Sequence, residues 1–158
     1  MDNKKKKRRV VMSKWIYLLI AAVSGSAMAL QGTMNAALGK VVGLWESTLI
    51  VHLIGTVTTL IIIVVLGVGF SNLSKISQAP WYVLLGGVLN VIIIYAIVRS
   101  MPQIGVGNAT TAIIVAQVLT ALLIDNCGAF GMKKMSFQYL DLLGIALLAA
   151  GARILLLD

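Results

Sequence analysis

Stretches without charged side chains divide the chain into five long apolar segments joined by short polar connections. Four stretches carry no Asp, Glu, Lys or Arg: residues 15–39, 47–74, 76–98 and 100–124. The fifth, residues 137–157, carries Asp141 near its start and Arg153 near its end. A helix needs about 20 apolar residues to cross the roughly 30 Å hydrocarbon core of a bilayer. The pattern therefore predicts five transmembrane helices, at about residues 15–39, 46–69, 80–98, 105–124 and 137–157.

The apolar runs are typical of helices and not of membrane strands. A membrane β-barrel alternates polar and apolar residues over about 10 positions, whereas the run from Ile61 to Leu66 is apolar throughout. Because the bilayer core holds no water for the backbone to bond, such a run satisfies its hydrogen bonds internally as a helix. The connections are too short for an extramembrane domain. We therefore expect an all-α membrane protein whose function resides in the helix bundle.

The composition excludes an ordinary soluble enzyme. Hydrophobic residues make up 59% of the chain and charged residues 11%, whereas a soluble domain has about 45–50% and about 25%. One cysteine and one histidine leave no pair for an internal disulfide and no cluster for zinc. The sequence contains no GxSxG elbow, Walker loop or HExxH motif. We therefore expect no enzyme activity, no metal and no cofactor.

The net charge of +8 is concentrated in an N-terminal tail. Thirteen Lys and Arg oppose five Asp and Glu, and seven of the thirteen lie within the first 14 residues. A run of like charge is usually solvated and disordered. We therefore interpret residues 1–13 as a basic cytoplasmic tail and residues 14–158 as the membrane domain. No groove-reading or aromatic element follows the tail, so nucleic acid is not an expected partner.

The positive-inside rule places the N-terminus in the cytoplasm. Ten Lys and Arg then lie inside, and three lie outside at Lys40, Arg99 and Arg153. Counted from Met12, a second potential start, the bias falls to four inside against three outside. A bias so close to zero is expected of a protein that inserts in both orientations.

The first segment is also consistent with a signal peptide. A basic start, an apolar stretch and then Ala27-Met28-Ala29 resemble a signal sequence with its cleavage site. Cleavage there would leave four spans. Apolar character continues past Ala29, and Gln31 and Asn35 fit the same helix, which favours an uncleaved first span.

Polar side chains within the spans are the candidates for a substrate or ion pathway. They are Gln31, Asn35, Glu46, His52, Asn90 and Gln117. Gln31 and Asn35 are four residues apart and so share a helix face. A second polar face consists of Thr48, His52, Thr56 and Thr59. Because lipid contact by such groups is costly, both faces are expected to point inward or toward a partner.

Structural roles are the alternative for each of these side chains. Threonines in membrane helices often bond to their own backbone, and Gln31 and Asn35 could serve only as ties between helices. Glu46 could be stabilised by the helix dipole in a first turn, and His52 could be a neutral packing residue. Small residues are expected at close helix contacts, here at Ser24, Gly25, Ser26, Ala29, Gly32, Gly86, Gly87, Gly144 and Gly151.

A set of motifs spread along the chain resembles one known family. They are Gln31-Gly32-Thr33-Met34-Asn35-Ala36-Ala37-Leu38-Gly39, Gly55-Thr56, Pro80-Trp81, Gly86-Gly87, Gln117, Asp125, Gly128 and Gly131. Their order and spacing are similar to those of the YdcZ-like family in the drug/metabolite transporter superfamily, described as inner-membrane exporters. The resemblance covers about residues 13–157 and implies a multi-pass transporter of the bacterial plasma membrane. Family members often carry Asp-His-Phe-Gly where this chain has Asp125-Asn126-Cys127-Gly128, so this chain lacks a second histidine there.

An odd number of spans suggests how such a chain functions. Two five-helix units joined in opposite orientations make the inverted repeat that many transporters use, with substrate near the midplane between the units. We therefore expect one half of an inverted-repeat transporter, paired in the bilayer with an oppositely oriented copy or a paralogue. The expected function is secondary transport of a small molecule, with export favoured. Proton coupling through Glu46 or His52 is the mechanistic hypothesis, and Glu46 is preferred because a lone carboxylate can bind a proton or a cationic substrate. The alternative is a non-transporting membrane subunit or scaffold.

Overall fold

The computed structural model describes the backbone of residues 2–156 and the side chains of residues 14–156. Five α-helices follow one another along the chain: α1 (Asp2–Val42), α2 (Leu44–Val65), α3 (Gly86–Ile104), α4 (Val106–Cys127) and α5 (Tyr139–Leu155). Short 3-10 helices lie in the connections: η1 (Ser71–Gln78), η2 (Trp81–Leu85) and η3 (Ala129–Gly131). The described residues contain no strand, in agreement with the all-helical prediction.

Four of the helical segments are long and apolar enough to cross a membrane. They are Lys14–Val42, Leu44–Val65, Trp81–Ile104 and Val106–Cys127. Helix α5 has 17 residues and so spans about 26 Å, because the chain stays non-helical until Tyr139 instead of entering the helix at residue 137. The structure thus contains four candidate spans and a fifth helix. The predicted tail, residues 1–13, has its side chains outside the described residues, and its boundary with the membrane domain remains a prediction.

Single glycines make the two tightest connections between helices. Helix α1 continues to Val42 and α3 to Ile104, so the connections left between the predicted helices, residues 40–45 and 99–104, are replaced by the single residues Gly43 and Gly105. These two glycines have φ of 97° and 82°, a region that residues with a Cβ rarely adopt. Conversely, α2 ends at Val65, four residues before its predicted end. The structure therefore corrects the predicted ends of the first three helices.

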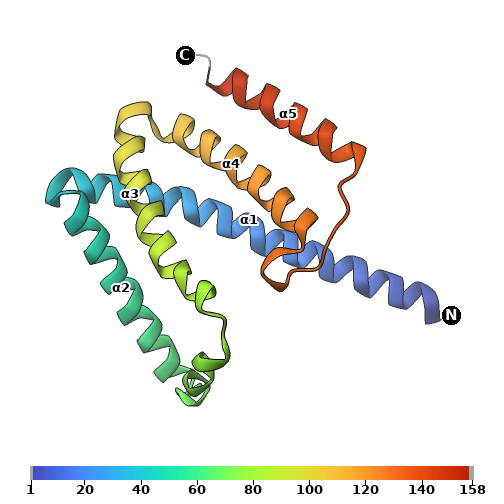
Figure 1. Ribbon diagram of the computed structural model, residues 1–158, viewed down its shortest axis with the longest axis horizontal. Coiled ribbons are helices and arrows are strands. Elements are labelled where there is room, and N and C mark those ends of the chain that lie inside the picture. Colours follow the sequence, from blue (N-terminus) through green and yellow to red (C-terminus); the bar gives the residue numbers. More distant parts are fainter. Residues whose placement is uncertain (1, 157–158) are drawn as a thin grey trace.

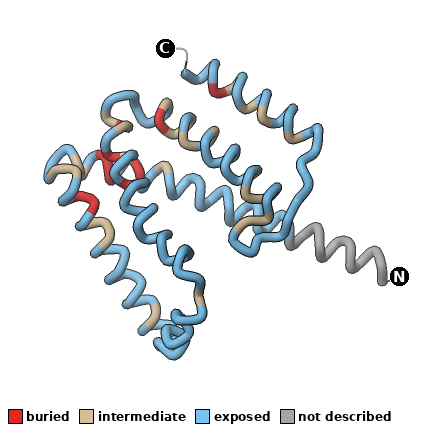
Figure 2. Tube along the Cα trace, in the orientation of Figure 1, coloured by how far each residue is buried: buried red, intermediate tan, exposed pale blue. Residues whose placement is uncertain are grey.

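The helices form an open arrangement that is held together at one end. Figure 1 shows α2 and α3 diverging from α1 as they run away from the Gly43 turn, while α4 lies between α3 and α5. Figure 2 shows most of the buried residues near the α1–α2 and α3–α4 turns, with Ala152 buried apart from them on α5, whereas the opposite ends of α2 and α3 are exposed. At the centre of this buried end, Ala36, Met101 and Ala109 pack together with Ile97.

Only some of the small residues mark close contacts within the chain. A Cβ added to Gly32 would lie 2.9 Å from Cε of Met101, so the prediction is confirmed there. At another five glycines the chain itself makes no such contact, because an added Cβ would meet nothing within 4 Å among the described residues: Gly25, Gly86, Gly87, Gly144 and Gly151. Small residues permit close approach but do not specify it, so these faces are open to lipid or to a partner.

Most of the apolar surface of the helices is not covered by other parts of the chain. At most 11% of the residues in the apolar window of any candidate span are buried. Large apolar side chains such as Leu30, Val64 and Leu147 are more than 60% exposed. In water such a surface would be strongly unfavourable, so these helices require lipid or a second chain around them.

Candidate functional site

A polar cavity lies between α1, α2 and α3, at the place where α2 and α3 diverge from α1. Its volume is about 450 Å³, which is within the range of small-molecule sites, roughly 300–1,000 Å³. Its lining consists of Gln31 from α1, Asn90 and Ile94 from α3, and Val51, His52, Gly55, Thr56, Thr59 and Leu60 from α2. The predicted threonine and histidine face of α2 thus forms one wall of the cavity.

His52 and Asn90 join the two diverging helices across this cavity. The amide nitrogen Nδ2 of Asn90 lies 3.0 Å from Nε2 of His52, and Nδ1 of His52 lies 2.7 Å from the carbonyl oxygen of Thr48. A carbonyl oxygen can only accept a hydrogen bond, so Nδ1 carries the proton and donates a hydrogen bond to the carbonyl oxygen of Thr48. Nε2 is then unprotonated and accepts from Asn90. The two contacts fit the Nδ1–H tautomer of the imidazole, with Nε2 as the acceptor from Asn90.

The threonine hydroxyls of α2 donate their hydrogen bonds to backbone carbonyls of the same helix. Thr48 donates to the carbonyl of Leu44 at 2.8 Å, Thr56 to that of His52 at 2.9 Å, and Thr59 to that of Gly55 at 2.9 Å. This confirms the backbone-bonded alternative for Thr48 and Thr59. The hydroxyl oxygens of Thr56 and Thr59 line the cavity with their protons already engaged, and so offer it only lone pairs.

Asn35 and Ser47 lie outside the cavity lining, in the closely packed region beside the Gly43 turn, which is called the closed end below. Asn35 is 5% exposed and Ser47 is 0% exposed, whereas Gln31, one turn earlier on α1, is exposed and lines the cavity. Ser47 donates its hydroxyl proton to the carbonyl of Leu44 at 2.9 Å. The shared face of Gln31 and Asn35 is therefore divided between an open, polar end and a packed end.

Glu46 and Gln117 lie away from this cavity. Glu46 is exposed in the first turn of α2, where its carboxylate lies over the Cα of Gly43. Gln117 is exposed on α4 and lines a second cavity of about 470 Å³ between α1, α3 and α4, whose other walls are mainly apolar, with Met28, Ile97 and Ile113 among them. Of the six predicted pathway residues, the structure thus brings Gln31, His52 and Asn90 together.

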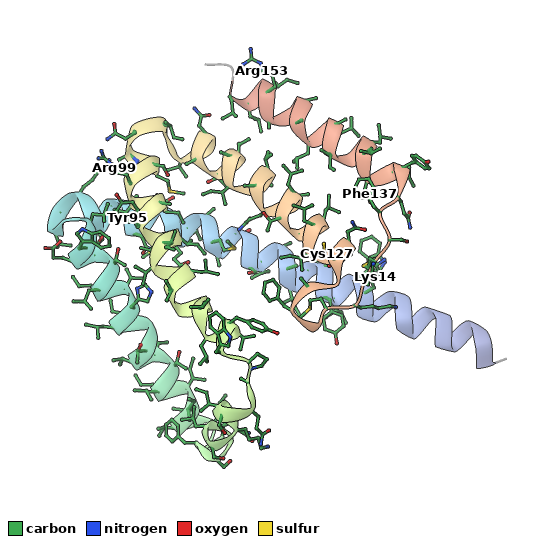
Figure 3. The ribbon with its side chains drawn as sticks, viewed as in Figure 1. Lys14, Tyr95, Arg99, Cys127, Phe137 and Arg153 are labelled. Carbon is green, nitrogen blue, oxygen red and sulfur yellow. The ribbon has the colours of Figure 1, made fainter. Side chains whose placement is uncertain are left out.

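The closed end also contains an aromatic pair that the sequence pattern did not single out. The rings of Trp45 and Tyr95 lie tilted against each other, with centroids 5.2 Å apart, and link the start of α2 to the middle of α3. Figure 3 labels Tyr95 on α3. The two residues lie far apart along the chain, and no local pattern signals their pairing. A signal did exist for Ile94, which follows Asn90 by four residues and so shares its helix face. Asp141, in the first turn of α5, accepts a hydrogen bond from the Gln138 backbone N–H at 2.7 Å in a capping box.

Comparison with protein-family models agrees with the helical architecture. The model of the family described as "Putative inner membrane exporter, YdcZ" matches residues 16–154. This range covers the first candidate span from residue 16 onward, the other three spans completely, and all of α5 but its last residue. Comparisons with curated proteins and with solved structures found no match. Because the family match covers far more than half of a chain with four apolar, membrane-length helices, the chain belongs to the YdcZ family of inner-membrane exporters.

Proposed function

We propose that the chain is a small-molecule secondary transporter that exports its substrate, and that the cavity between α1, α2 and α3 is the substrate site. The carrying observation is the gathering of Gln31, His52 and Asn90 around one cavity of about 450 Å³. Polar side chains at membrane depth are costly, and they are characteristic of substrate and ion pathways. Gln117, beside the second cavity, is kept as a further candidate on the same pathway.

The proposed working unit is an antiparallel pair, made with an oppositely oriented copy or a paralogue. The accessible surface of the chain is 12760 Å², whereas a compact globular chain of this mass exposes roughly 7,700 Å². The site is walled by only three helices and its surroundings are apolar. A second unit in opposite orientation would supply the missing wall and produce the inverted repeat of many transporters.

Proton coupling belongs to the same proposal. His52 and Glu46 are the titratable side chains of α2. Glu46 lies over the Gly43 turn, whereas His52 lines the cavity and is bonded across it to Asn90. A coupling group must respond to substrate, so this geometry favours His52 over Glu46. The proposed topology keeps the N-terminus in the cytoplasm of the bacterial inner membrane.

Efflux from proteoliposomes tests the proposed function even while the substrate is unidentified. Vesicles holding the full chain are loaded with a metabolite mixture, a pH gradient is imposed, and the solutes released are identified by mass spectrometry. We expect at least one solute to leave faster than from protein-free vesicles. Asn90→Leu should abolish this release, whereas Gln103→Leu, an amide of the same helix outside the cavity lining, should not. Equal release from all vesicles would favour the scaffold alternative.

A further inference from the structure

The cavity between α1, α2 and α3 contains no ionisable side chain except His52. Its polar lining is otherwise made of amides and hydroxyls, from Gln31, Asn90, Thr56 and Thr59. The remaining titratable side chains of the described parts of these helices are outside the lining: Lys14, Tyr17, Lys40, Glu46, Tyr95 and Arg99. With His52 neutral, a bound ion would find no counter-charge at membrane depth, and an isolated ion in such a place is strongly disfavoured.

The hydrogen-bond inventory defines what an uncharged ligand must supply. Both nitrogens of His52 are engaged, by Asn90 and by the carbonyl of Thr48. The hydroxyl protons of Thr56 and Thr59 are also engaged. Oδ1 of Asn90 has no partner among the described side chains and backbone, so it is free to accept. A ligand that donates one hydrogen bond and is otherwise apolar, against Val51, Leu60 and Ile94, matches this wall.

A second proton on His52 would replace the acceptor that Asn90 presents to the cavity, Oδ1, with a donor. The Nδ1–H group of His52 would still donate to the carbonyl oxygen of Thr48. The new Nε2–H group would point at Nδ2 of Asn90, which is also a donor. Two opposed donors repel, and rotating the Asn90 amide by half a turn restores the bond by placing Oδ1 against Nε2–H. The amide NH₂ then replaces the oxygen toward the cavity. The proton comes from water in the open cavity and returns to it when His52 is neutral again.

We propose that the cavity takes an uncharged, partly apolar molecule that donates a hydrogen bond to Oδ1 of Asn90, and that protonation of His52 displaces it by reversing the Asn90 amide. This inference rests on the proposed function, because it names the substrate class and the coupling step of that same site. Ligand and proton exclude one another, and by linkage each weakens the binding of the other by the same factor. Such exclusion is what exchange of a substrate for a proton requires.

The single histidine of the chain makes the switch directly observable. The full chain, purified without a histidine tag and labelled with ¹⁵N-histidine, shows only His52 by NMR. At pH 8 we expect a protonated Nδ1 and an unprotonated Nε2, and at pH 5 two protonated nitrogens. Asn90→Leu should shift the Nε2 signal at pH 8, and Gln103→Leu should leave it in place. A protonated Nε2 at pH 8, or an Nε2 signal insensitive to Asn90→Leu, would overturn the proposal.

Three probes of one shape and different charge test the ligand class. They are phenylacetamide, phenylacetate and phenethylammonium, each titrated into the purified chain while binding is measured at pH 8 and pH 5. We expect phenylacetamide alone to bind, more weakly at pH 5, with its Kd raised about tenfold by Asn90→Leu, the loss of one hydrogen bond. The His52→Gln variant should bind phenylacetamide with the same Kd at pH 8 and pH 5. Preference for a charged probe, no binding by any of the three, or unchanged pH dependence in His52→Gln would overturn the proposal.

The two proposals can fail separately. Binding of phenylacetamide that responds to pH through His52, combined with no solute release from any vesicle, would retain the site and refute transport. Solute release that needs Asn90 but is carried by charged solutes only would retain transport and refute the ligand class proposed for the cavity.

Discussion

Gly39 of α1 lies directly against Val98 of α3, so closely that a Cβ at position 39 would overlap Cγ1 of Val98. The same Cβ would lie 3.3 Å from Oγ of Ser47, at the start of α2. Three helices therefore meet at a position that has room for no side chain. Because Asn35 and Ser47 are buried beside this point, the contact belongs to the closed end, outside the lining of the polar cavity.

Replacing Gly39 with alanine should destabilise the fold. An added methyl group in a packed site costs about 1–3 kcal/mol in free energy of unfolding, which exceeds the gain of roughly 0.5–1 kcal/mol that Gly→Ala brings to a helix. Gly25→Ala is the matched control on α1, because its Cβ would meet nothing within 4 Å. Unfolding by SDS titration measures both. Equal stability of the two variants would show that α1 and α3 separate without cost.

Gln31 and Asn35 share a helix face, but changing each to leucine should affect a different property of the protein. Gln31→Leu removes a cavity-lining amide that is exposed, so solute release should be lost while the purified protein keeps its stability and assembly. Asn35→Leu places a larger side chain at a buried position of the packed end and should lower stability by about 1–3 kcal/mol, the usual cost of overpacking. Size-exclusion and solute release measured on the same preparations separate the two outcomes. Normal release by Gln31→Leu would remove it from the pathway.

The bond between His52 and Asn90 should appear as an energetic coupling between α2 and α3. A double-mutant cycle with His52→Phe and Asn90→Leu should give a coupling energy of about 0.6–1.7 kcal/mol, the range measured for hydrogen bonds between membrane helices. A parallel cycle pairing His52→Phe with Gln103→Leu should give a value near zero, because Gln103 is at the far end of α3. A zero value in both cycles would mean that the 3.0 Å contact contributes nothing to folding.

Glu46→Gln should leave the pH dependence of transport unchanged. The Glu46 carboxylate lies in the first turn of α2, over Gly43 and outside the cavity lining. Its loss should cost only the interaction of a negative charge with the helix dipole, about 0.3–1 kcal/mol of stability. His52→Gln should abolish the pH dependence instead. If flux loses its response to the pH gradient only in Glu46→Gln, the coupling group is the carboxylate and the His52 proposal is wrong.

The sequence predicted the helices well where charge and hydropathy define them, and less well at their ends. Charged residues such as Lys40 and Arg99 suggested wide connections, yet a helix tolerates them, and one glycine with positive φ is sufficient to turn the chain. Likewise Gly86 and Gly87 were expected at close contacts, but packing depends on the partner surface as well as on small size. Helix α5 is shorter than predicted partly because residues 137 and 138, which were counted in the predicted span, stay non-helical before Tyr139.

The candidate site was predictable as far as one helix extends. The spacing of Thr48, His52 and Thr56 placed the polar face of α2 correctly, since helical periodicity is local. The partner of His52 was not predictable, because Asn90 is 38 residues away and its contact depends on how α2 and α3 diverge. The place of the Glu46 carboxylate was not predictable either, because the direction of its side chain depends on the Gly43 turn.

Removing residues 1–11 should make the orientation in the membrane mixed. The full chain has ten basic residues on the expected cytoplasmic side against three outside, and the chain from Met12 has four against three. Because positively charged residues near the spans direct insertion, a reporter fused to the C-terminus should read outside for the full chain and both sides for the truncated one. A full-length control in which Lys4, Lys5, Lys6, Lys7, Arg8 and Arg9 become Gln should behave like the truncation, which separates charge from length. A truncation that stays wholly N-in would contradict dual insertion, and the antiparallel unit would then require a paralogous partner of opposite orientation.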